Sequence, residues 1–121
     1  MSTNNFSNSD SYITGNIKIA VVGLGYVGLP LAVEFGKKFA VIGYDKNHLR
    51  VSELKTGIDR TGEIKNTELA KSKNLLITNN LKTLSSANIY ILTVPTPVDS
   101  KNMPDLNSII NATKTVAKFL N

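Results

Sequence analysis

The chain contains no cysteine and has no long hydrophobic run. Without cysteine, its 121 residues can form no disulfide bond, no thiolate metal site and no cysteine nucleophile. No segment approaches the roughly 18 apolar residues that a membrane-spanning helix requires. The polar residues 1–15 also lack the apolar segment of a secretory signal peptide. We therefore predict no membrane association, a cytoplasmic location and a disordered tail over residues 1–15.

Arginine is scarce as well: only two of the 14 basic residues are Arg, against 9 acidic residues and a net charge of +5. Arg is the residue best suited to bidentate phosphate recognition, and the sequence shows no basic run or helix-turn-helix pattern. We interpret the positive charge as a scattered, solvated surface and predict no nucleic-acid partner. Hydrophobic residues make up 41% of the chain, so residues 16–121 are expected to fold as one domain.

Strand and helix patterns alternate along the chain. Short β-branched, apolar runs predict strands over residues 17–23, 39–45, 74–78 and 87–94. Helical patterns predict helices over residues 26–38, 46–55, 66–73 and 104–120. This order is typical of an α/β layered domain. We predict a Rossmann-like parallel sheet of about four strands with flanking helices, which is a truncated form of that fold.

Helical spacing also predicts which faces of two helices are buried. In the first helix, Val27, Leu31 and Phe35 fall on one face. Pro104 is expected to begin the last helix, whose apolar side comprises Leu106, Ile109, Ile110, Val116, Ala117 and Leu120.

Three glycines with the spacing G-x-G-x-x-G follow the first predicted strand and begin the first predicted helix. Gly23 permits a tight turn, Gly25 lets the backbone approach a pyrophosphate, and Gly28 lets the helix pack closely on the sheet. The N–H groups around Tyr26 and Val27 would then face the phosphates at the positive end of the helix dipole. A glycine-rich turn also suits a purely structural connection, so the neighbouring residues must decide between the two.

Asp45 ends the second predicted strand, twenty residues after Gly25. An acidic side chain there accepts hydrogen bonds from a ribose diol. Its charge repels a 2′-phosphate and so favours NAD over NADP, although Lys46 could accept that phosphate. FAD is less favoured, because FAD-binding domains usually prefer Glu at this position. The strand–helix–strand order, the glycines and Asp45 together predict a dinucleotide-binding site with NAD as cofactor.

Two segments resemble a known family. The stretches KIAVVGLGYVGLPLAVEFGKKFAVIGYDKNHLRVSELKTG and ANIYILTVPTPVDSKNMPDL are similar to the N-terminal NAD-binding domain of the UDP-glucose/GDP-mannose dehydrogenase family. The resemblance covers residues 17 to about 120. Within that family it is strongest to the bacterial branch, such as the Vi-antigen type, that oxidises UDP-N-acetyl-hexosamines for surface polysaccharides. The GLGYVGLPLA and VPTPVD blocks at this separation are specific to the family.

The resemblance implies cofactor-binding roles for particular residues. The pyrophosphate loop would comprise Gly23, Leu24, Gly25, Tyr26, Val27 and Gly28. Asp45 matches the ribose-binding acid, and Arg50 matches a basic residue that reaches the cofactor, with an exposed helical charge as the alternative. Pro95 and Thr96 belong to the VPTP block; Thr96 matches a threonine beside NAD, with a simple turn residue as the alternative. Residues 56–63 lie where the family places a loop near the site, and we assign them no role.

Members of this family oxidise the C6 hydroxyl of the sugar to a carboxylate with two NAD⁺ in succession, through a cysteine-bound thioester. Because the chain has no cysteine, we predict no catalytic residue and no metal ligand within it. We interpret it as the N-terminal cofactor-binding part of a longer, homo-oligomeric enzyme acting on a UDP-sugar. One alternative is a UDP-glucose or GDP-mannose 6-dehydrogenase. Another is a non-catalytic NAD-sensing Rossmann module, against which the VPTPVD block argues.

Overall fold

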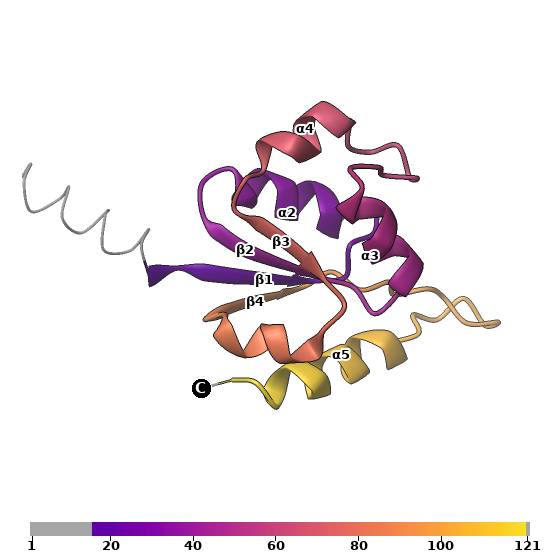
Figure 1. Cartoon of the computed structure of the whole chain (residues 1–121). Helices are drawn as coiled ribbons and strands as arrows, with labels where there is room; N and C mark the ends of the chain where they lie inside the picture. The colour runs from indigo at the N-terminus through magenta and orange to yellow at the C-terminus, as the bar shows by residue number, and fades with distance from the viewer. Residues whose placement is uncertain (1–15, 121) are drawn as a thin grey trace, which may run out of the picture.

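A computed structural model describes residues 16–120, so the predicted tail over residues 1–15 lies outside the described part. The sheet consists of β1 (Lys18–Val22), β2 (Ala40–Tyr44), β3 (Leu75–Thr78) and β4 (Ile89–Leu92). The strand order is β3-β2-β1-β4, and all three neighbouring pairs are parallel. The predicted Rossmann-like parallel sheet is thus confirmed, and Figure 1 shows it at the centre of the domain.

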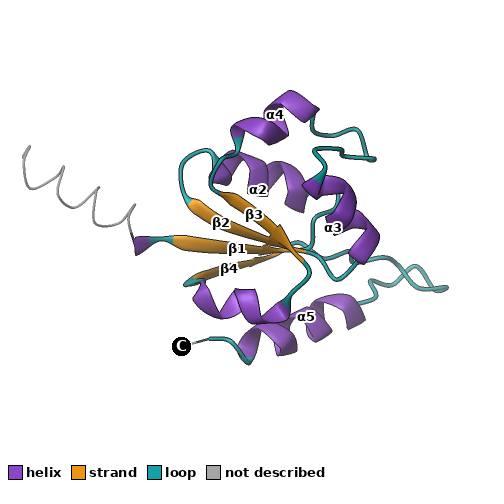
Figure 2. Cartoon of the chain, viewed as in Figure 1, coloured by secondary structure: helices purple, strands orange, loops and turns teal. Residues whose placement is uncertain are grey.

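Helices cover both faces of this sheet (Figures 1 and 2). One face carries α2 (Gly28–Gly36), α3 (His48–Lys55) and α4 (Asn66–Lys71). The other face carries the 3₁₀ helix η1 (Leu81–Ser86) and α5 (Asn107–Ala117). The sequence did not predict η1, whose start is capped by the Asn80 side chain accepting from the Lys82 N–H at 3.0 Å.

Strand β1 is buried on both faces, as predicted from its continuous β-branched run. Ile19 and Val21 belong to the core cluster beneath α2 and α3, whereas Ala20 and Val22 belong to the cluster beneath η1 and α5. This division follows from the two-residue period of a strand, which turns successive side chains to opposite faces. The domain therefore has two apolar layers, one on each side of a single sheet.

The predicted buried face of the first helix is wrong: Val27 is 68% exposed, and Leu31 and Phe35 are only partly buried. Helix α2 begins only at Gly28, so Val27 lies in the preceding turn, outside the helical pattern. The residues that α2 buries are Gly28, Leu29, Ala32, Val33 and Gly36.

The prediction for the last helix also needs correction. Helix α5 begins at Asn107, and Pro104 instead pairs with Val98 in an isolated antiparallel bridge. Val116 is the one buried residue of this helix, and it packs on the sheet with Ala112 and Phe119. The other predicted apolar positions include exposed side chains, at Leu106, Ile110 and Leu120. The side of the helix that packs on the sheet is therefore the one with Ala112 and Val116, continued by Phe119 just after the helix ends.

The carboxyl ends of all four strands meet at one edge of the sheet, because the strands are parallel. The segments that leave this edge are residues 23–27 after β1, residues 45–47 after β2, residues 79–80 after β3 and residues 93–106 after β4. In parallel α/β sheets, ligands bind at this edge. The fold thus brings the predicted glycine turn, Asp45 and the VPTP block to one side of the molecule.

Candidate functional site

The three glycines after β1 are present for different physical reasons. Gly23 has φ +104°, and a Cβ built on it would lie 2.8 Å from the Thr93 carbonyl oxygen. A Cβ on Gly28 would overlap the Gly23 carbonyl oxygen and the Thr93 hydroxyl. A Cβ on Gly25, by contrast, would have no heavy atom within 4 Å. The fold requires glycine at positions 23 and 28 but not at 25, where open space is left for a ligand.

Hydrogen bonds to the neighbouring strands hold this turn in place. The Gly23 N–H donates to the Tyr44 carbonyl at 2.8 Å, and the Thr93 N–H donates to the Val22 carbonyl at 2.8 Å. The Thr93 hydroxyl donates to the Gly23 carbonyl at 2.7 Å. Thr93 therefore ties the end of β4 to the glycine turn. Sequence reasoning missed it, because Thr93 falls within the strand predicted over residues 87–94, whereas β4 ends at Leu92.

The backbone N–H groups of residues 25–28 donate to no other group within residues 16–120. The first helical hydrogen bond is made by the Leu29 N–H, which donates to the Gly25 carbonyl at 3.1 Å. Tyr26 and Val27 are exposed, each to 68%. Unpaired donors at a helix N-terminus, combined with the helix dipole, suit a phosphate. The turn has the arrangement that the sequence predicted for a pyrophosphate loop.

Asp45 and Arg50 hold the two polar groups of the Leu24 backbone. The Leu24 N–H donates to Asp45 Oδ2 at 2.9 Å, and Arg50 Nε donates to the Leu24 carbonyl at 2.8 Å. Asp45 Oδ1 also accepts from the Asn47 N–H at 2.9 Å. A carboxylate oxygen can accept more than one hydrogen bond, so Asp45 keeps acceptor capacity for a ribose diol. The predicted ribose-binding acid therefore has a structural task in addition.

Arg50 is buried, with only 8% of its surface exposed, so the alternative of a solvated helical charge is wrong. Its Nη1 donates to Asp59 Oδ1 at 2.7 Å, whereas Nη2 is buried and has no hydrogen-bond partner within residues 16–120. A buried cationic donor without a partner is unusual. Because Nη2 is closed off from solvent, Arg50 can contact a cofactor only if the guanidinium or the turn moves. Direct contact with the cofactor stays a prediction.

A cavity of about 330 Å³ lies at the carboxyl edge of the sheet. It brings together three predicted site residues, Gly23, Asp45 and Pro95. Residues 24–28 of the glycine turn, Arg50 and Thr96 were also predicted for the site but do not line the cavity. Thr96 is exposed in the segment after β4. The volume is at the lower end of the roughly 300–1,000 Å³ typical of small-ligand pockets, which suits part of a dinucleotide. Sequence reasoning missed the contribution of α5, which supplies Asn107, Ser108, Asn111, Ala112 and Thr115.

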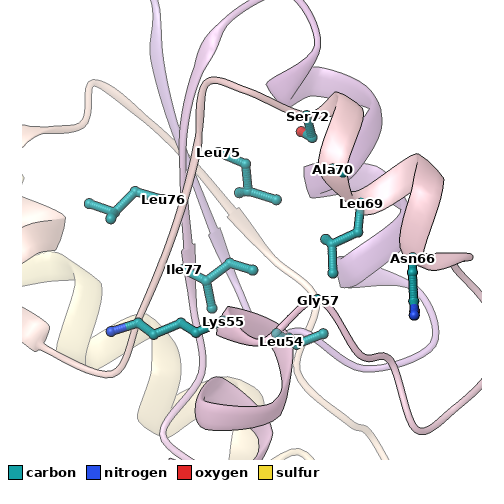
Figure 3. Close-up of a pocket in the computed structure, with 10 residues that line it drawn as sticks. All are labelled: Leu54, Lys55, Gly57, Asn66, Leu69, Ala70, Ser72, Leu75, Leu76 and Ile77. Atoms are coloured by element: carbon teal, nitrogen blue, oxygen red, sulfur yellow. The ribbon is translucent and has the colours of Figure 1, made fainter.

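A second cavity, of about 350 Å³, lies between α3, α4 and the edge strand β3 (Figure 3). It is largely apolar, and Lys55 is its only charged lining residue. None of its lining residues belongs to the glycine turn or to the end of β2. The cavity at the carboxyl edge is therefore the candidate site.

No group of three or more His, Asp or Glu residues between positions 16 and 120 could hold a metal ion. In the same part of the chain, no helix is both long enough and apolar enough to cross a membrane.

The parallel sheet, the glycine turn with its unpaired N–H groups and the acid at the end of β2 define a dinucleotide-binding domain of the Rossmann type. The open space at Gly25 fits a bound pyrophosphate. The chain belongs to the UDP-glucose/GDP-mannose dehydrogenase family, because the NAD-binding domain of that family matches residues 17–121. NAD is accordingly its cofactor, as the sequence predicted.

Relatives of known name cover nearly all of the described domain. The chain is 50% identical over 105 residues to UDP-N-acetyl-D-glucosamine 6-dehydrogenase of Pseudomonas aeruginosa, a match covering 87% of this chain and 25% of that protein. It is also 50% identical over 105 residues to Protein CapL of Staphylococcus aureus, covering 87% and 24%. The solved UDP-D-ManNAc dehydrogenase from Pyrococcus horikoshii matches with a TM-score of 0.75 and 31% identity, covering 87% and 26%. The chain thus spans about a quarter of the length of these relatives.

Proposed function

We propose that this chain is the NAD-binding part of a nucleotide-sugar 6-dehydrogenase. The enzyme oxidises the C6 hydroxyl of a UDP-N-acetyl-hexosamine to a carboxylate with two NAD⁺, for surface polysaccharide biosynthesis. The observation that carries this proposal is the 50% identity over 105 residues to a UDP-N-acetyl-D-glucosamine 6-dehydrogenase. Identity to the UDP-D-ManNAc dehydrogenase is lower, at 31%. UDP-N-acetylglucosamine is therefore the first substrate to test.

In this proposal, residues at the carboxyl edge hold NAD⁺ by its adenosine and pyrophosphate. Asp45 accepts from the ribose hydroxyls with the lone pairs that Leu24 and Asn47 leave free. The N–H groups of residues 25–28 donate to the pyrophosphate oxygens. Pro95 and Thr96 lie beside the cofactor after β4. Bound NAD⁺ supplies the hydride acceptor for the oxidation.

The groups that carry out the oxidation are expected in other parts of a longer enzyme. The 121 residues contain no cysteine, and a covalent route through a thioester needs one. The UDP-sugar site and the homo-oligomeric state belong to that longer protein as well. A cytoplasmic location is also a prediction, which fractionation of cells expressing the natural gene would test.

The proposal is tested by measuring NADH production by the longest natural chain that contains these residues. The substrates to compare are UDP-GlcNAc, UDP-GalNAc, UDP-ManNAc, UDP-glucose and GDP-mannose. We expect the highest kcat/KM for a UDP-N-acetyl-hexosamine. A preference for UDP-glucose or GDP-mannose would refute the substrate class. Binding of NAD⁺ without turnover of any nucleotide sugar would instead favour the non-catalytic sensing module.

A further inference from the structure

Asp59 is a buried acceptor on which several donors converge. Its Oδ1 accepts from Arg50 Nη1 at 2.7 Å, from the Thr61 hydroxyl at 2.7 Å and from the Thr61 N–H at 3.0 Å. Its Oδ2 accepts from the Ile64 N–H at 2.9 Å. The Asp59 side chain is fully buried. Burial acts to raise the pKa of Asp59, but the hydrogen bonds from Thr61, Arg50 and Ile64 outweigh it and lower the pKa to about 2.

Arg50 connects this carboxylate to the pyrophosphate loop. The same guanidinium that binds Asp59 through Nη1 binds the Leu24 carbonyl through Nε at 2.8 Å. That carbonyl lies four residues before Gly28, so it is the acceptor that the Gly28 N–H would use if α2 began one turn earlier. In the structure this carbonyl accepts from Arg50, and the Gly28 N–H has no partner within residues 16–120. By bonding to the Leu24 carbonyl, Arg50 thus holds the carbonyl with which the Gly28 N–H would otherwise pair.

We propose that Asp59 is a positioning residue for cofactor binding. It holds the Arg50 guanidinium, which fixes the Leu24 carbonyl and keeps residues 25–28 in the conformation that receives the pyrophosphate. The inference rests on the proposed function, because it takes NAD⁺ as the ligand of this loop. It also gives a role to residues 56–63 after α3, which the family resemblance placed near the site without assigning one.

The carboxylate itself is required at this position, rather than a side chain of the same shape. Both Asp59 oxygens accept from N–H donors. In Asp59→Asn one of these oxygens becomes an NH₂ group, which faces a donor in either orientation of the amide. If the NH₂ group faces Arg50, the guanidinium loses its acceptor; if it faces Ile64, the guanidinium keeps only a neutral amide oxygen in place of a carboxylate. In both orientations the buried Arg50 loses its charged partner and is held less firmly beside Leu24.

Calorimetric titration of NAD⁺ into the longest natural chain tests this coupling. We expect Asp59→Asn to weaken binding by roughly tenfold, the scale of losing a hydrogen bond between charged groups. The matched control is Thr61→Val, which removes one hydrogen bond to the same carboxylate without touching Arg50. Its affinity is expected to stay within about twofold of wild type.

A double-mutant cycle separates positioning from general destabilisation. If Asp59 acts through Arg50, Asp59→Asn causes no further loss of affinity in an Arg50→Met background, so the two effects are non-additive. Additive losses, or equal affinities of wild type and Asp59→Asn, would overturn the positioning role and leave the proposed function standing. If Asp59→Asn does not fold, Arg50→Lys replaces it. A lysine keeps the charge but lacks the planar fork whose separate Nε and Nη1 atoms reach Leu24 and Asp59, so wild-type affinity in that variant would also overturn the inference.

An amide NMR spectrum recorded without NAD⁺ gives a readout that does not depend on cofactor binding. We expect Asp59→Asn, but not Thr61→Val, to shift the amide signals of residues 24–28. Unmoved signals would refute the inference even if NAD⁺ binds normally. Failure of the wild-type protein to bind NAD⁺, together with shifted signals, would instead refute the proposed function and the cofactor role while retaining the Asp59–Leu24 coupling.

Discussion

Replacing Gly25 with alanine tests whether the glycine turn binds a ligand or is only a structural connection. The added Cβ would have no heavy atom within 4 Å, and Gly25 does not adopt a left-handed φ. The free energy of unfolding should therefore change by less than about 1 kcal/mol. The same methyl group occupies the space that we assign to the pyrophosphate. If it displaces one or two hydrogen bonds to a charged phosphate, each worth about 1.5–3 kcal/mol, affinity for NAD⁺ falls by roughly tenfold to ten-thousandfold.

Gly28→Ala is the matched comparison, because its Cβ would overlap the Gly23 carbonyl and the Thr93 hydroxyl. We expect it to destabilise the domain by about 3 kcal/mol or more, which lowers Tm by roughly 10 °C or more. Thermal unfolding followed by circular dichroism, together with calorimetric titration of NAD⁺, measures both quantities for both variants. A Gly25→Ala variant that binds NAD⁺ as tightly as wild type would refute the pyrophosphate assignment and leave the motif as a structural turn.

Three further predictions concern Asp45, Asp59 and the chain as a whole. Asp45→Ala should weaken NAD⁺ binding by about 1–3 kcal/mol and reduce discrimination against NADP⁺. Equal NAD⁺ affinities of wild type and Asp45→Ala in titration calorimetry would rule out the ribose contact. Because folding lowers the pKa of Asp59 from 3.8 to about 2, its ionised form stabilises the fold by about 2 kcal/mol above pH ~4, and this is lost as pH falls to ~2. Urea unfolding should show the stability gap between wild type and Asp59→Asn narrowing over that interval; a constant gap would contradict the assignment. Finally, the 121-residue chain alone should produce no NADH from UDP-GlcNAc, UDP-GalNAc or UDP-glucose, since it has no cysteine; measurable turnover would require a catalytic group that we have not identified.

Local sequence was enough to predict the order of strands and helices, the glycine turn and the acid after β2. These features depend on residues that are close in the chain. Continuous β-branched runs predict buried parallel strands such as β1, and the glycine spacing after such a strand predicts a turn into a helix. The structure confirms this architecture and leaves glycine at position 25 without a packing reason, as a ligand-contacting role requires.

Which side chains lie together depends on contacts between segments that are far apart in the chain, and these appear only in the folded structure. Periodicity placed Val27 on a buried face, but the start of α2 at Gly28 leaves it exposed. Whether Arg50 is exposed or buried could not be predicted from the adjacent residues in the sequence, since its partners Leu24 and Asp59 come from other parts of the chain. A lone arginine on a short helix is ordinarily solvated. Arg50 is buried here because folding brings the Leu24 carbonyl and the Asp59 carboxylate within hydrogen-bond distance of its guanidinium. The residues next to Arg50 in the sequence do not predict either contact.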